Sequence, residues 1–119
     1  MSKHDPKVTL QQINDYALRA QELCAQNAYP AILTDWHKRL AFERVMEVIG
    51  EAVKRLPPEL TARYPAVQWR LVAGMRDRVS HGYDAIDYAT LWDIVRDDVP
   101  TLLANVAQML KDLENAPGT

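Results

Sequence analysis

The sequence predicts an all-α fold, an up-and-down bundle of four main helices with room for a short fifth one. Apolar residues recur at helical spacing through four long segments, and no segment alternates between polar and apolar residues as a strand would. Proline and glycine residues fall near the ends of these segments. Helices joined by short loops pack most simply as an up-and-down bundle.

The first segment carries one apolar stripe, whose members are Leu10, Ile13, Ala17, Ala20 and Cys24. Cys24 is the only cysteine of the chain, which excludes an intrachain disulfide and a multi-cysteine metal site. Its place on the stripe indicates a buried free thiol.

A second helix is expected to begin after Thr34 as the N-cap, with Asp35 favourably placed in the field of the helix dipole. Pro57 and Pro58 end it. Its apolar stripe consists of Phe42, Val45, Ile49, Ala52 and Leu56. The side chains expected to face away from that stripe are Arg39, Glu43, Glu47 and Lys54.

The third helix is expected to start at Pro65, since proline suits the first helical position, and to end near Ser80 before a C-capping Gly82. A short helical turn is expected over 58–63, between the second and third helices. Thr90 is expected to cap the fourth helix, which Pro100 should kink because its ring clashes with the carbonyl one turn back.

The length of 119 residues, with 48% apolar and 25% charged residues, fits one globular domain over 7–114 with flexible tails at 1–6 and 115–119. The net charge of −2 argues against a general nucleic-acid coat protein. It leaves room for an RNA enzyme, which needs only a local cationic pocket. No apolar run approaches the length of a membrane span, and a reducing cytoplasm fits the composition.

The stretch from Met75 to Tyr83 combines Arg76, His81 and Tyr83 at the end of the third expected helix. Cleavage of RNA by its own 2′-hydroxyl requires a base, an acid and a cation for the phosphate. His81 suits the proton transfers, and the planar guanidinium of Arg76 suits the phosphate. Asp77, Arg78 and Ser80 are candidates for supporting RNA contacts. We expect no metal and no cofactor in this site.

Structural roles compete with this interpretation. Arg76 could form a salt bridge, His81 could cap the helix end, and Tyr83 could belong to the core. Trp69, seven residues before Arg76, could stack on a base, although packing is the commoner role of a tryptophan. Trp36 and Trp92 are expected to be packing residues.

The residues from Tyr64 to Leu113 resemble the HepT family, a branch of the HEPN superfamily. The family motif Arg-x4-His-x-Tyr is met by Arg76, His81 and Tyr83, and the similarity extends over 8–113. Context on both sides also fits: Tyr64-Pro65, Gly74-Met75, Leu91-Trp92 and Asp98-Val99-Pro100 around the motif, and Ile49-Gly50-Glu51-Ala52 upstream.

The resemblance implies a helical homodimer in which the two motifs face each other across one cleft. It implies a metal-independent ribonuclease that acts as the toxin of a toxin–antitoxin pair. The antitoxin would be an MntA-type nucleotidyltransferase, which silences the toxin by transferring AMP to Tyr83. Asp77 departs from the asparagine common at that place, and loss of activity would leave an alternative function, a non-catalytic dimer that binds and regulates the nucleotidyltransferase.

Overall fold

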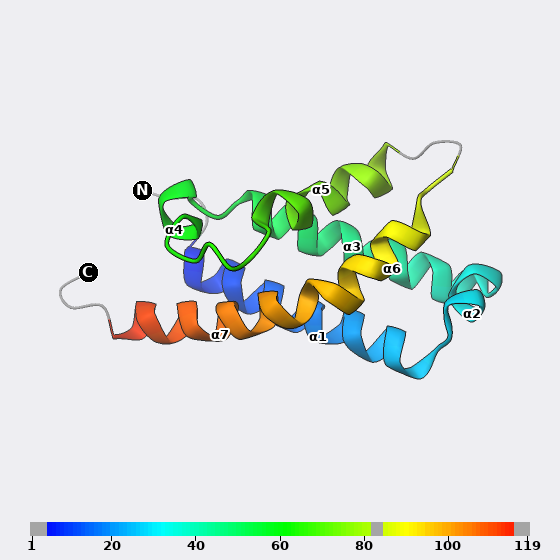
Figure 1. The fold of residues 1–119 in the computed structure, drawn as a ribbon, viewed down its shortest axis with the longest axis horizontal. Helices are drawn as coiled ribbons and strands as arrows, with labels where there is room; N and C mark the ends of the chain where they lie inside the picture. The colour runs from blue at the N-terminus through cyan, green and yellow to red at the C-terminus, as the bar shows by residue number, and fades with distance from the viewer. Residues whose placement is uncertain (1–4, 82–84, 116–119) are drawn as a thin grey trace.

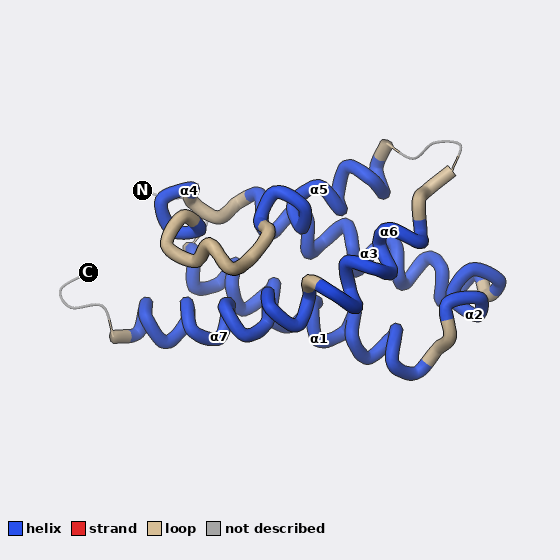
Figure 2. Tube along the Cα trace, viewed as in Figure 1, coloured by secondary structure: helices blue, strands red, loops and turns tan. Residues whose placement is uncertain are grey.

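The computed structural model describes residues 5–81 and 85–115, and the regular structure in these ranges is entirely helical. This confirms the all-α prediction. Figures 1 and 2 show an elongated molecule with extents of 51 × 27 × 22 Å. The helices of this described part are α1 (Pro6–Gln26), α2 (Tyr29–Thr34), α3 (Trp36–Lys54), α4 (Pro58–Thr61), α5 (Trp69–Ser80), α6 (Tyr88–Asp97) and α7 (Val99–Glu114).

Helix α3 occupies the centre of the bundle, with α1 on one side and α5 on another, and α1 also packs along α7 (Figure 1). The largest side chains of the core have no exposed surface; they include Ile13 of α1, Phe42, Met46 and Ile49 of α3, and Leu102 of α7. Burying such side chains is the main contribution to stability, about 1.5–3 kcal/mol for each one. The predicted stripes of the first two helices therefore lie mainly on the buried faces of α1 and α3, although Cys24, expected to be buried, and Val45 are only partly buried.

The N-cap of α3 is Asp35, one residue later than predicted. Its carboxylate accepts hydrogen bonds from the backbone N–H groups of His37 at 2.9 Å and Lys38 at 3.4 Å. Thr34 is not available as the cap because it ends the short helix α2, where its hydroxyl donates to the carbonyl of Pro30. The packing role predicted for Trp36 is wrong: the side chain is 57% exposed and stacks on His37.

Helix α5 begins at Trp69, later than the predicted start at Pro65. The intervening residues form turns, in which the N–H of Val67 donates to the carbonyl of Tyr64 and the side chain of Val67 is buried. The Trp69 indole donates to the same carbonyl at 3.0 Å. This contact and the half-buried ring favour the packing role of Trp69 over base stacking.

Helix α6 is capped by Asp87 rather than by the predicted Thr90. The Asp87 carboxylate accepts from the backbone N–H of Thr90 at 3.0 Å and from its hydroxyl at 2.6 Å. Thr90 therefore lies inside the first turn of the helix, where it is the donor to the cap. An aspartate three residues ahead of a threonine satisfies an N-terminal N–H group that the helix itself cannot satisfy.

Pro100 separates two helices, where a kink in one helix was predicted. Helix α6 ends at Asp97 and α7 starts at Val99, with Asp98 between them and Pro100 in the first turn of α7. Proline is well tolerated there because the N–H groups of the first turn have no partner within the helix. The two helices follow each other closely along the bundle (Figure 1).

The described helices begin at Pro6 and end at Glu114. Asp5 caps α1, whose first residue is Pro6, and α7 ends at Glu114. Most of the predicted tails, and the predicted C-cap Gly82, fall outside the described residues. None of the helices in the described ranges combines the length and the apolar character needed to cross a membrane.

Candidate active site between α3 and α5

Arg76, the first residue of the predicted motif, lies where α5 packs closely against α3. This approach depends on Gly50, a buried residue of α3. A Cβ atom at position 50 would lie 2.5 Å from the backbone nitrogen of Arg76 and 2.9 Å from its Cβ. Only glycine allows the two backbones to come this close. The position of Arg76 relative to α3 is thus set by a contact between backbones.

The Arg76 guanidinium lies between two carboxylates. Its Nε is 3.2 Å from Oε2 of Glu51 on α3, and its Nη1 is 3.4 Å from Oδ1 of Asp77. The Arg76 side chain is 40% exposed, so it is held by the protein and still reaches solvent. Arginine can bind two phosphate oxygens at once through its pair of Nη atoms. The contact with Glu51 uses Nε and does not involve these atoms.

Asp77 is also bound from α3, by Lys54. The Lys54 ammonium lies 3.0 Å from Oδ1 of Asp77, and this hydrogen bond is the main reason that the pKa of Asp77 is lowered; the charges of Arg76 and His81 add to the effect. The carboxylate is therefore ionised over the whole physiological range. Asp77 pairs with Arg76 and interacts electrostatically with His81, the two interactions that the sequence suggested for it.

Ser80 faces α3 as well, one turn after Arg76. Its hydroxyl donates to Oε2 of Glu47 at 3.1 Å, and the other oxygen of Glu47 is 2.9 Å from Nη1 of Arg44. Glu47 thus fixes a serine of α5 and an arginine of its own helix with its two oxygens. Ser80 and Arg76 therefore share the face of α5 that is turned toward α3, because both side chains contact glutamates of α3.

His81 follows directly after α5 as its C-cap. Its backbone N–H donates to the carbonyl of Asp77 at 2.9 Å, and the residue is exposed. Arg78 is exposed too, and its charge contributes to the lowered pKa of Asp87, after the hydrogen bonds from Thr90. Arg78 therefore lies on the side of α5 that faces the start of α6. Tyr83, the predicted modification site, lies outside the described residues.

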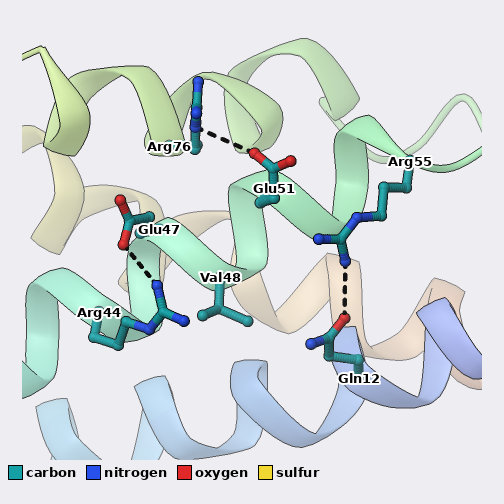
Figure 3. Close-up of a pocket in the computed structure, with 7 residues that line it drawn as sticks. All are labelled: Gln12, Arg44, Glu47, Val48, Glu51, Arg55 and Arg76. Atoms are coloured by element: carbon teal, nitrogen blue, oxygen red, sulfur yellow. Dashed lines mark hydrogen bonds and ion pairs between the residues drawn. The ribbon is translucent and has the colours of Figure 1, made fainter.

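A groove of about 260 Å³ runs along α3 beside Arg76. We call it the α3 groove; it is lined by Gln12 of α1, by Arg44, Glu47, Val48 and Glu51 of α3, by its C-cap Arg55, and by Arg76 of α5. Figure 3 shows Arg44 and Arg55 on either side of Val48, with Arg76 coming from α5 next to Glu51. Three arginines and two glutamates give the lining a net charge of +1, in a chain whose net charge is −2.

Sequence reasoning missed the part of the site that α3 contributes. Glu43, Glu47 and Lys54 were expected only to face away from the apolar stripe of α3. In the structure Glu47 and Lys54 contact α5, and Glu43 accepts from the hydroxyl of Tyr88 on α6 at 2.5 Å. The signal was the spacing of Glu43, Glu47 and Glu51, four residues apart on one helix face. Carboxylates in such a row can accept hydrogen bonds from basic and hydroxyl side chains of neighbouring helices.

The geometry described above can be compared with known proteins. A model of the family described as "Ribonuclease HepT-like" matches residues 13–109. The chain belongs to this HepT-like family. The protein named "Putative RNase MJ1216" of Methanocaldococcus jannaschii is 32% identical over 114 residues, which cover 96% of this chain and 94% of that protein. "Probable ribonuclease HepT" of Thermococcus cleftensis is 30% identical, over 92% of this chain and 99% of that protein.

Membership of the HepT-like family confirms the resemblance found in the sequence, the HEPN-like helical fold and the enzyme class, a ribonuclease. A third relative, "Putative RNase MJ0127" of Methanocaldococcus jannaschii, is 34% identical over 114 residues, which cover 96% of this chain and 94% of that protein. No solved structure matches the chain.

Proposed function

We propose that this HepT-like protein is a toxin that cleaves RNA without a metal, with Arg76 and His81 as its catalytic residues. The observation that carries the proposal is the position of Arg76. Two carboxylates and the close α3–α5 contact hold its guanidinium at the rim of a polar groove, and the same helix ends at His81. An arginine held on α5 and an exposed histidine at the C-terminal end of the same helix would provide the fixed cation and the proton carrier that phosphodiester cleavage requires.

In the proposed reaction, the ribose 2′-oxygen attacks the adjacent phosphorus as its proton is taken up by a base. The bond from phosphorus to the 5′-oxygen breaks, and that oxygen receives a proton. The products carry a 2′,3′-cyclic phosphate and a 5′-hydroxyl. His81 transfers the protons, and the guanidinium of Arg76 stabilises the charge that develops on the phosphate oxygens. Glu51 is a positioning residue, since it binds Arg76 through Nε.

Arg78, Asp77 and Ser80 have different parts in this proposal. Arg78 is exposed next to His81 and is a candidate for contact with a further phosphate. Asp77 contacts Lys54 and Ser80 contacts Glu47, so both residues hold α5 against α3. The proposed homodimer would place two copies of the motif across one cleft, which doubles the number of histidines available for proton transfer.

The deciding experiment uses protein shown by intact mass to be unmodified, incubated with cellular RNA and a metal chelator. We expect the wild type to cleave RNA and leave 2′,3′-cyclic phosphate ends. His81→Ala should lower the rate by about 10²- to 10⁴-fold, the usual contribution of a general acid–base group. His37→Ala is the matched control, because His37 is an exposed histidine in the first turn of α3 that stacks on Trp36 and lies close to Asp35, and this variant should cleave like the wild type.

Intact RNA in the presence of folded wild type would reject catalysis by this protein. The observation that favours the alternative function, a helical dimer that regulates a nucleotidyltransferase, is the contact of Asp77 with Arg76 at 3.4 Å. If the wild type is inactive, Asp77→Asn tests that contact. Recovered cleavage would show that the pairing inhibits the enzyme, whereas continued inactivity would favour the regulatory dimer.

We further propose that a nucleotidyltransferase antitoxin of the MntA type neutralises the toxin by transferring AMP to Tyr83. The Tyr83 oxygen would attack the α-phosphorus of ATP, form a phosphodiester with AMP and release pyrophosphate. Negative charge placed two residues after His81 would compete with RNA for Arg76. Incubation with ATP and the antitoxin should add the mass of AMP to the wild type and to Tyr88→Phe but not to Tyr83→Phe. Modification of Tyr83→Phe would place the site elsewhere.

A further inference from the structure

Two arginines of the α3 groove have no part in the chemistry proposed above. Arg44 lies on α3, Arg55 is the C-cap that directly follows it in a helical backbone conformation, and both are exposed. Residues eleven apart on a helix return to nearly the same face, about 16 Å apart along the axis. Arg76 reaches the groove from α5, at the level of Glu51, which lies between them. The three guanidinium groups therefore follow the length of α3 in the order Arg44, Arg76, Arg55.

The direction of α5 decides which of these arginines lies near His81. Glu47 contacts Ser80 and Glu51 contacts Arg76, so α5 runs antiparallel to α3. His81 consequently lies toward the end of the groove that holds Arg44. Arg55 is one helical turn beyond Glu51, about 6 Å further along α3, on the side of Arg76 away from His81.

Arg55 differs from the other two arginines in the charge of its partner. Arg44 is 2.9 Å from a carboxylate oxygen of Glu47, and Arg76 is 3.2 Å from one of Glu51. Arg55 instead donates to Oε1 of Gln12 on α1, at 3.4 Å, and this acceptor is a neutral amide. The net charge of +1 in the groove thus belongs to the Arg55 end. The Gln12 amide also brings two N–H donors to that end.

We propose that Arg55 and Gln12 bind the RNA phosphate next to the one held by Arg76, on the side away from His81. This inference rests on the proposed function, because it takes Arg76 to hold the phosphate that is cleaved. The ligand is a phosphodiester of the RNA backbone. The 260 Å³ of the groove is below the usual 300–1,000 Å³ of a pocket that encloses a whole small molecule, and it suits a phosphate and part of its sugar.

The inference is tested by binding, so that catalysis is not needed. The probe is an RNA octamer methylated at every 2′-oxygen, which cannot be cleaved because the attacking hydroxyl is blocked. Its Kd is measured over a range of salt concentrations for the wild type, for Arg55→Gln and for Arg96→Gln. The last variant is the matched control, since Arg96 is exposed and ion-paired with Asp93 and Asp97 on α6, outside the α3 groove.

We expect Arg55→Gln to raise the Kd about five- to tenfold at low salt, as the loss of one charge-assisted contact does. The slope of log K against log salt should fall by about 0.7, the value for one phosphate contact with a single strand. Arg96→Gln should change neither quantity. Gln12→Glu should also raise the Kd, because the new carboxylate would pair with Arg55. Equal binding by Arg55→Gln and wild type would overturn the inference.

A free nucleotide is the other source of a phosphate. AMP is therefore titrated against the same variants. If Arg55→Gln abolishes binding of AMP and leaves binding of the methylated RNA unchanged, the site serves a nucleotide and the inference is wrong. Failure of the proposed function would look different: RNA would remain uncleaved in the activity assay while binding of the methylated octamer still depended on Arg55.

Discussion

The α1–α7 and α3–α5 interfaces use opposite means to join two helices. Between α1 and α7 the contact is made by fully buried apolar side chains such as Ile13, Leu102 and Met109. An ion pair between these two helices, Lys7–Glu114, is long at 3.9 Å, and both of its side chains are exposed. Between α3 and α5, Glu47, Glu51 and Lys54 contact Ser80, Arg76 and Asp77. The first interface stabilises the fold, and the second fixes charged groups in position.

The largest effect on stability is expected at the apolar interface. Leu102→Ala removes a fully buried side chain of α7 and should lower the free energy of unfolding by about 2–5 kcal/mol. Urea denaturation measures this loss. The variant should still cleave RNA at the wild-type rate per folded molecule, at temperatures below its transition. If a folded Leu102→Ala lost activity, the separation between the two interfaces would not hold.

A smaller but more specific effect is expected at Gly50. The added Cβ of Gly50→Ala would press on the Arg76 backbone at 2.5 Å, and overpacking of this kind costs about 1–3 kcal/mol. Gly74→Ala is the matched control, because a Cβ there meets nothing within 4 Å and alanine should stabilise α5 by up to about 1 kcal/mol.

Thermal melting should therefore move in opposite directions for the two glycine variants. Activity should fall in Gly50→Ala beyond the loss of folded protein, since Arg76 is displaced. A Gly50→Ala protein as stable and as active as the wild type would show that α5 can move away from α3 at little cost.

Glu51→Gln should change stability by less than about 1 kcal/mol, because the Arg76–Glu51 pair is 40% exposed on both sides. Its effect on cleavage should be larger, a reduction of kcat by about tenfold or more, as expected when a catalytic group loses its orientation. Asp15→Asn, which breaks the exposed Asp15–Arg19 pair of α1, is the control and should alter neither stability nor kcat. Equal activity of both variants would exclude a positioning role for Glu51.

The smallest effect at neutral pH is expected at Tyr88, which links α6 to α3 through Glu43. Burial, with the hydrogen bond to Glu43, raises the pKa of Tyr88 to about 12. A raised pKa means that the neutral phenol stabilises the fold below about pH 10, the ordinary tyrosine value, and that this contribution is lost as the pH rises through 12.

Ultraviolet titration checks this directly. One tyrosine of the wild type should ionise near pH 12, and this step should be missing in Tyr88→Phe. Unfolding followed from pH 9 to 12 should show a steeper loss of stability in the wild type than in the variant. Ionisation of every tyrosine near pH 10 would contradict the described environment of Tyr88.

The sequence was sufficient for the all-helical fold, although it did not predict α2 or the break between α6 and α7. Apolar periodicity identified the buried faces of α1 and α3, because burial imposes that period directly. Arg76 lies on α5 and His81 directly follows this helix, as the motif spacing predicted. Helix starts were less accurate, since Thr34, Asp35, Asp87 and Thr90 can all act as caps and the choice depends on neighbouring turns.

The contribution of α3 could not be found in the same way. Glu47, Glu51 and Lys54 carry no motif, and their spacing equally fits a solvated helix face. Only the tertiary contact, made close by Gly50, turns that face toward α5. The sequence therefore placed Glu43 and Glu47 away from the apolar stripe without identifying their partners on α6 and α5. The sequence of α3 alone does not indicate which helix its polar face packs against.

The pairing of the groove arginines has a consequence for the speed at which substrate arrives. Arg44, Arg55 and Arg76 each have an oxygen acceptor within 2.9–3.4 Å, which for two of them is a carboxylate, and the whole chain has a net charge of −2. Beyond a Debye length the protein therefore presents little attraction to a polyanion. Encounter with RNA should proceed at the ordinary, unsteered rate of about 10⁵–10⁷ M⁻¹s⁻¹. Discrimination of the substrate should therefore take place after collision, when phosphates contact guanidinium groups that are already held in position by their partners.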